Sequence, residues 1–241
     1  MLGLSPTDWL AVLAAAVLTG LAKTAVPGLA SIAVALCALV LPAKESTGVM
    51  LVLLLVGDVL AVWAYRRDAD RALLASLVPS VVLGVLAGAA FLRWSTQDQT
   101  RRGIGVVLLA LVALTVFQRQ RGRRGRAPVR TAYGALAGFT TMVANAGGPV
   151  TSMYFLASRF SVAAFLGTTA WFFFAVNLVK LPFTVSMGLI RPEHLALDLV
   201  LAPVVVLAAL AGRRLAARLP LRVFEPLVIA TTIIAAVPLV L

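Results

Sequence analysis

The stretch Asn145-Ala146-Gly147-Gly148-Pro149 interrupts a long apolar segment that runs from about residue 131 to residue 158. Glycine adds backbone freedom and proline lacks the amide hydrogen that a helix needs, so a continuous helix is not expected here. In so apolar a chain, the interruption predicts a broken helix at membrane depth. Backbone polar groups freed there are tolerated only where protein or a wet cavity satisfies them. We therefore expect the break to form one wall of a binding site.

The composition indicates an integral membrane protein. The chain has 241 residues, of which 61% are hydrophobic and 12% are charged, whereas a soluble domain carries roughly 25% charged residues. The net charge is +12, and its arginines lie between apolar spans. This pattern favours a topological role and contact with anionic lipid headgroups at the arginine loops over nucleic-acid binding.

The order of apolar and charged segments predicts two repeats in an all-α fold. Residues 1–118 form the N-terminal repeat, 119–130 a basic cytoplasmic linker and 131–241 the C-terminal repeat. Each repeat is expected to hold a broken helix pair, arranged as a hairpin, and three transmembrane helices. An offset of 119 places Gly28 on Gly147 and Asp58 on Asn177. Spans are expected at about 47–65, 72–92, 103–117, 163–187, 195–211 and 226–241.

The distribution of basic residues predicts the orientation. If each broken pair starts and ends on one side, each half crosses an odd number of times and the repeat is inverted. One side then receives 14 basic residues, among them the six arginines of 119–130, and the other side receives 5. The positive-inside rule places the first set in the cytoplasm and both termini outside. Whether the first broken pair is a hairpin or two full crossings stays open at this point.

Three ionisable residues, Lys23, Asp58 and Lys180, fall within apolar stretches. A charge at the centre of a membrane helix costs on the order of 3 kcal/mol, so such residues usually face a cavity and a partner. Lys180 lies three residues after Asn177, on the same helical face. Two structural alternatives remain: Lys180 extends to the membrane surface, or Lys23 and Asp58 form a fixed internal ion pair.

The two breaks predict a site for a small anion. Helices beginning at Pro27-Gly28 and at Gly148-Pro149 would present positive N-terminal ends with free amide groups, which bind anions. The Asn145 side chain can donate or accept a hydrogen bond there. The alternative is that both breaks are packing kinks. The expected substrate-binding residues are Lys23, Pro27, Gly28, Asn145, Gly147, Gly148 and Lys180.

Other features carry less information about function. We expect His194 to be a solvated loop residue, Asp198 to lie near the membrane interface, and the aromatic run 171–174 to face lipid. Gly84 and Gly88 have the spacing that lets membrane helices approach closely. No zinc-ligand spacing, nucleophile motif or phosphate-binding loop is present, so neither a metal nor another cofactor is expected.

Nearly the whole chain resembles the sulfite exporter TauE/SafE family of membrane permeases. The resemblance lies in Gly20-Leu21-Ala22-Lys23, Val26-Pro27-Gly28, Pro42-Ala43-Lys44, Gly57-Asp58 through Tyr65-Arg66-Arg67, Asn145-Ala146-Gly147-Gly148-Pro149 and Gly167-Thr168-Thr169. It implies a two-repeat helical transporter of the bacterial inner membrane that moves sulfite or small organosulfur anions with proton coupling. The family tends to have a run of glycines after the first helix, where this chain reads Lys23-Thr24-Ala25-Val26-Pro27-Gly28.

Together these features predict a secondary transporter of a small anion, such as sulfite, a sulfonate or a carboxylate. Lys23 and Lys180 would complement the anion, Asn145 would orient it, and Asp58 is the candidate proton carrier. One alternative is an uncoupled anion channel or facilitator that uses the same residues. Another is a membrane assembly partner that transports nothing. An enzyme is not expected, and a homodimer is left open.

Overall fold

The computed structural model describes residues 4–96, 99, 127–145, 147–157 and 160–236, and these residues form nine helices with no strand. The all-α prediction is therefore confirmed. The predicted span 103–117 and most of the predicted linker 119–130 lie outside the described residues. The helices are α1 (Pro6–Thr24), α2 (Leu29–Val40), α3 (Ala43–Tyr65), α4 (Arg71–Trp94), α6 (Ala127–Ala144), α7 (Gly147–Ala157), α8 (Val162–Ser186), α9 (Pro192–Ala216) and α10 (Leu221–Ala236).

Five of the helices, α1, α3, α4, α8 and α9, are long and apolar enough to cross a membrane. The chain is a multi-pass membrane protein. By contrast, α2 and α7 have 12 and 11 residues, which corresponds to about 18 and 16 Å of helix. Neither helix can cross a hydrocarbon core about 30 Å thick. Each broken pair thus has one long arm and one short arm.

Both predicted breaks are present. In the first, α1 ends at Thr24 and α2 begins at Leu29; in the second, α6 ends at Ala144 and α7 begins at Gly147. Asn145 has a φ of 52°, in the left-handed region that asparagine tolerates better than most residues. This residue therefore turns the chain out of α6 toward α7.

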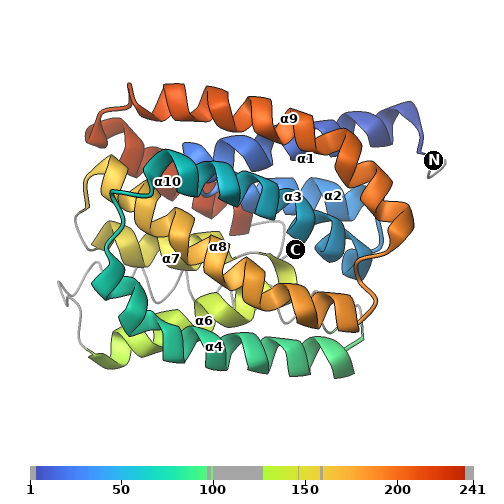
Figure 1. The fold of residues 1–241 in the computed structure, drawn as a ribbon, viewed down its shortest axis with the longest axis horizontal. Helices are drawn as coiled ribbons and strands as arrows, with labels where there is room; N and C mark the ends of the chain where they lie inside the picture. Colours follow the sequence, from blue (N-terminus) through green and yellow to red (C-terminus); the bar gives the residue numbers. More distant parts are fainter. Residues whose placement is uncertain (1–3, 97–98, 100–126, 146, 158–159, 237–241) are drawn as a thin grey trace.

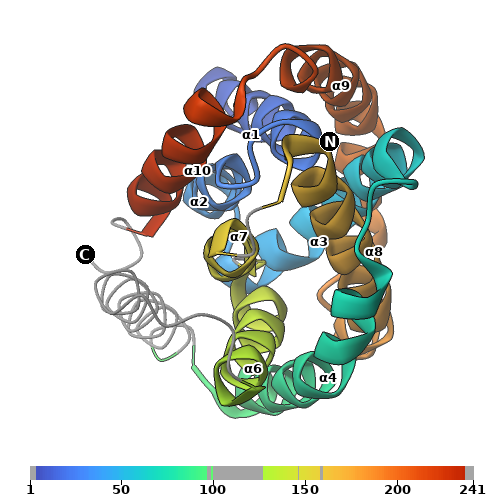
Figure 2. The same ribbon diagram turned by 90° about the vertical axis from the view of Figure 1, so that its left-hand side faces the viewer.

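The helices form a bundle in which the long helices run roughly along one axis (Figure 1). Viewed from the end, α1 and α9 lie on one side and α4 and α6 on the opposite side, with α3 and α8 between them (Figure 2). The pairs α1–α9, α4–α6 and α3–α8 are in contact. The short helix α7 lies near the middle of the bundle (Figure 2). The long helices therefore surround the breaks.

Glycines allow α4 and α6 to approach closely, as the spacing of Gly84 and Gly88 predicted. A Cβ atom at Gly84 would lie 2.9 Å from the Phe139 amide nitrogen, and one at Gly88 would lie 2.9 Å from the Met142 Cβ. The facing helix contributes Gly138, where a Cβ would lie 3.0 Å from the Val85 amide nitrogen. Side chains at these positions would force the two helices apart.

The helix bounds have an internal regularity. Shifting the bounds of α1, α2, α3 and α4 by 119 residues reproduces those of α6, α7, α8 and α9 to within three residues. The contacts follow the same correspondence, because α1 packs on α9 as α6 packs on α4. A glycine at the same place in α3 and α8 contacts the turn that follows the other helix: Gly48 meets Leu189, and Gly167 meets Tyr65 and Ala69.

We expect Gly84→Val to destabilise the protein, because the new side chain would overlap backbone atoms of α6. Overpacking of this kind typically costs about 1–3 kcal/mol and occasionally more. The matched control is Leu83→Val on the same helix, where the side chain is 65% exposed. Thermal unfolding of both detergent-solubilised variants measures the difference, and equal midpoints would show that this helix contact is not tight.

Candidate functional site

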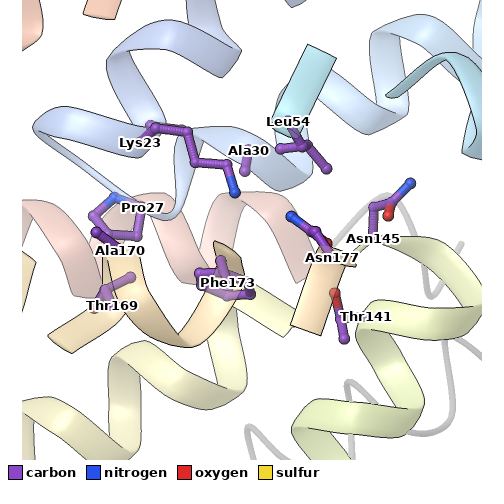
Figure 3. A pocket seen from close by; sticks show the side chains of 12 residues that line it. Lys23, Pro27, Ala30, Leu54, Thr141, Asn145, Thr169, Ala170, Phe173 and Asn177 are labelled. Carbon is purple, nitrogen blue, oxygen red and sulfur yellow. The ribbon is translucent and has the colours of Figure 1, made fainter. Parts of the chain in front are cut away.

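A cavity lies where the two breaks meet inside the bundle (Figure 3). Its wall includes Pro27 of the first break, and Asn145 and Gly148 at the second break. A Cβ atom at Gly148 would lie 3.3 Å from the Pro27 carbonyl oxygen, so the two breaks are direct neighbours. The lining residues are Ala22, Lys23, Pro27, Ala30, Leu54, Thr141, Asn145, Gly148, Thr169, Ala170, Phe173 and Asn177.

Lys23 contributes the cation of the cavity wall and forms an ion pair with Asp58. Its Nζ lies 2.6 Å from Asp58 Oδ1, and the two side chains are 7% and 0% exposed. The same ammonium lies 4.8 Å from the centre of the Phe173 ring, within the range of a cation–π interaction. Lys23 is in the last turn of α1, where the helix dipole favours a positive charge. The internal ion pair between Lys23 and Asp58, left open as an alternative, is therefore present. Lys23 also lines the cavity.

A chain of hydrogen bonds continues from Asp58 to the second break. Asn177 Nδ2 donates to Asp58 Oδ2 over 2.6 Å, and these are the two residues that the offset of 119 superimposes. Lys180 Nζ donates to Asn177 Oδ1 over 3.3 Å and also to Asn145 Oδ1. Asn145 Nδ2 in turn donates to the Thr47 carbonyl over 3.0 Å. Both breaks are thus joined by polar contacts through α3 and α8.

The predicted binding residues divide into three groups. Lys23, Pro27, Asn145 and Gly148 line the cavity, as predicted. Lys180 does not line it but lies behind the wall, fully buried, where it holds Asn145 and Asn177. The alternative in which Lys180 extends to the membrane surface is therefore wrong.

The other two predicted glycines contact protein rather than the cavity. A Cβ at Gly28 would overlap Thr231 of α10, and one at Gly147 would lie 2.9 Å from the Thr141 Cβ. These residues let helices approach and do not line the cavity.

The expected pair of free helix N-termini is only partly present. α2 begins at Leu29, one residue later than expected, and the amides of Leu29 and Ala30 donate to the Val26 and Pro27 carbonyls over 3.0 and 3.2 Å. These bonds form because the chain turns tightly before the helix. The first break therefore offers fewer free amides than its sequence suggested. In the second break, α7 begins at Gly147 rather than at Gly148.

Among the cavity residues that were not predicted as site residues, three contact the buried charged groups. Asn177 lies between Asp58 and Lys180. Two sequence features could have identified it as a site residue: the offset of 119 that pairs it with Asp58, and its position one turn before Lys180. Thr141 lines the cavity, and its hydroxyl accepts from Lys180 over 3.4 Å. Phe173 lies beneath Lys23. The expectation that the aromatic run 171–174 faces lipid is wrong for Phe172 and Phe173, which are buried.

A further expectation on a polar residue is wrong. His194, expected to be a solvated loop residue, is in the first turn of α9 and is buried, with Nε2 3.4 Å from Glu45 Oε2. Asp198 is buried within the protein, and its position near the membrane interface stays a prediction. Both residues lie on the inward face of α9, which sequence hydropathy alone did not distinguish from its lipid-facing side.

Two interrupted helix pairs that meet at a charged cavity inside a membrane bundle are the architecture of many secondary transporters. The described residues hold no group of three His, Cys, Asp or Glu side chains able to bind a metal ion. The chain belongs to the sulfite exporter TauE/SafE family, whose family model matches residues 12–239. It is thus a membrane transporter and not an enzyme, and the family implies a small anionic substrate. No curated protein and no solved structure matches the chain.

We expect single substitutions in the ion pair to destabilise the protein more than the double substitution does. Lys23→Gln leaves a buried carboxylate without its counter-ion, and Asp58→Asn leaves a buried ammonium. Breaking a buried pair from one side typically costs about 3–5 kcal/mol. Lys23→Gln with Asp58→Asn replaces the pair by neutral groups and should recover much of that loss. Thermal unfolding of the wild type, the two single variants and the double variant gives the coupling free energy between the two residues. Additive losses of stability would contradict a direct interaction.

Proposed function

We propose that this protein is a secondary transporter that binds a small anion, such as sulfite, an organosulfonate or a short carboxylate, in the cavity between its two breaks. One observation carries the proposal: two buried lysines belong to one polar network with Asp58, which Lys23 contacts directly and Lys180 reaches through Asn177. With Asp58 and both lysines ionised, this network has an excess of one positive charge. A charge at membrane depth is costly unless it is compensated, and a bound anion compensates this one.

The cavity wall supplies groups for both ends of such an anion. Lys23 and the Asn145 and Asn177 amides can donate hydrogen bonds to its charged oxygens. Thr141 and Thr169 add hydroxyl groups, and Thr169 Oγ1 has no hydrogen-bond partner among the described residues. Phe173, Leu54 and the alanines of the wall form an apolar surface for a short hydrocarbon group. The wall thus suits an anionic head with a small apolar tail.

Asp58 is the proposed proton carrier, because it is bound to Lys23 in the absence of substrate. An anion that takes over the Lys23 ammonium leaves the Asp58 carboxylate without its counter-ion, and a proton would neutralise it. Protonation of Asp58 in turn releases Lys23 for the anion. Since this linkage is reciprocal, each of the two ligands favours the binding of the other. The result is coupled movement of proton and anion.

The proposed setting is the bacterial inner membrane, with both termini outside the cytoplasm and two inverted repeats, 1–118 and 131–241, joined by the basic linker 119–130. The shared helix bounds at an offset of 119 support the repeat. The excess of arginine on one side supports the orientation. Binding of anionic lipid headgroups to the arginine loops and formation of a homodimer stay predictions.

We expect Lys180→Met to reduce anion transport by roughly 10- to 100-fold, the equivalent of a lost charge-assisted hydrogen bond. The change keeps most of the aliphatic stem but frees the Asn145 and Asn177 amides that orient the substrate. Uptake into proteoliposomes is measured for sulfite, methanesulfonate and acetate, with Arg93→Gln on the exposed surface as the charge-matched control. Unchanged transport by the Lys180 variant would remove Lys180 from the site.

A pH gradient distinguishes coupled transport from the alternative of an uncoupled channel or facilitator. We expect the wild-type protein to concentrate its anion in proteoliposomes with an imposed pH gradient, because proton movement supplies the driving force. A protonophore should abolish this accumulation, but the anion should still reach equal concentrations inside and outside the proteoliposomes. An uncoupled pore would not accumulate the anion, whether or not the protonophore is present. A membrane assembly partner would move no anion at all.

A further inference from the structure

Asp198 is a buried carboxylate that does not line the cavity described above. Its side chain lies on α9 at an exposed fraction of 3%. Among the residues that the structure describes, neither carboxylate oxygen has a hydrogen-bond partner. Asp58, by contrast, contacts both an ammonium and an amide. The described residues thus offer no hydrogen-bond partner to an ionised Asp198.

The surroundings of Asp198 favour a neutral acid. Its neighbours Leu197 and Leu201 belong to an apolar cluster to which α1 contributes Val12, α3 contributes Met50 and α2 contributes Cys37. The titratable groups near it are the Cys37 thiol, which lies within its electrostatic range, and His194 one turn earlier on α9. An ionised carboxylate without donors is costly in such a place, whereas the protonated form carries no charge.

The chemistry of the neighbourhood selects a proton over a metal cation as the ligand. A hard cation needs about six oxygen ligands, and the described residues gather no three His, Cys, Asp or Glu side chains that could hold one. The apolar cluster to which its neighbours Leu197 and Leu201 belong is made of aliphatic side chains, Met50 and the Cys37 thiol. A proton needs only the carboxylate itself.

Three residues lie between Asp198 and the surface of the protein. Arg191 and Glu45 form an ion pair over 3.2 Å, with side chains 50% and 25% exposed. Glu45 Oε2 lies 3.4 Å from the buried His194 Nε2, and His194 Nδ1 has no hydrogen-bond partner among the described residues. His194 and Asp198 are four residues apart on one helix, which places their Cβ atoms about 6 Å apart. A partly exposed acid, a buried imidazole and a buried acid thus follow one another inward.

We propose that Asp198 is a second proton-binding site of this transporter, loaded from the surface through Glu45 and His194 and separate from Asp58. Its role in coupling rests on the proposed function. Val205, seven residues further along α9 and so about 10 Å deeper, packs near Gly57, the neighbour of Asp58. Glu45 also lies two residues before Thr47, whose carbonyl binds Asn145. The proton site therefore adjoins α3, the helix that carries Asp58 and the Thr47 carbonyl.

Infrared difference spectroscopy tests the proton site without any transport. We expect wild-type protein to show the carbonyl band of a protonated carboxylic acid that disappears as the pH is raised. Asp198→Asn should lack this band, and Asp68→Asn, the same change at an exposed position, should keep it. Asp198→Leu serves as a second variant, because leucine suits the apolar cluster. Persistence of the band in the Asp198 variants, or its absence from the wild type, would overturn the proposal.

Transport assays then test the role of the site in coupling. Asp198→Asn should lower the accumulation driven by a pH gradient at least 10-fold, while exchange of internal for external anion falls much less, since exchange needs no net proton movement. Accumulation equal to that of wild type and Asp68→Asn would overturn the coupling role. A wild-type protein that moves no anion would refute the proposed function instead, and the infrared result would still decide whether Asp198 binds a proton.

Discussion

The ion pair between Lys23 and Asp58 sets the conditions for the rest of the structure. Two opposite charges deep in a membrane bundle are tolerated only when each is satisfied by the other and by further polar groups. Lys23 ends α1 beside the first break, and Asp58 lies in α3, so the pair fixes the break against that helix. Asn177 then brings α8 to the remaining carboxylate oxygen. One carboxylate therefore holds three helices in register.

Close helix packing makes this contact geometrically available. Gly57 precedes Asp58, and a Cβ there would lie 2.8 Å from the Lys23 Cγ, so only glycine leaves room for the lysine stem. Gly48 and Gly167 let α3 and α8 each approach the turn after the other helix. The polar residues that join the two helices are thus brought within hydrogen-bond distance by residues without side chains. Function in this fold depends on small residues as much as on charged ones.

The sequence predicted the elements of the fold better than the contacts between them. Breaks at Gly and Pro, and spans of apolar residues, follow from local backbone chemistry. Both breaks, and the beginnings of the five spans that fall within the described residues, were located to within five residues. The inward faces of the helices were harder to predict, because in a membrane protein the lipid-facing side is as apolar as the core. For that reason His194 was expected at an exposed position and Phe173 at a lipid-facing one. Lys180 was correctly expected to be near Asn145, but its place behind the wall depends on the crossing of α8 with α6.

The described contacts also explain how two buried lysines are stabilised beside the cavity. Each polar group that joins the breaks has a partner: Lys23 binds Asp58, Lys180 binds the two asparagines, and Asn145 binds the Thr47 carbonyl. In the proposed site, an anion would replace some of these contacts with its own. A substrate that replaces them incompletely leaves buried polar groups unpaired, at a cost of about 1–3 kcal/mol for each group. Selectivity among small anions therefore depends on which of them restores every contact that it breaks.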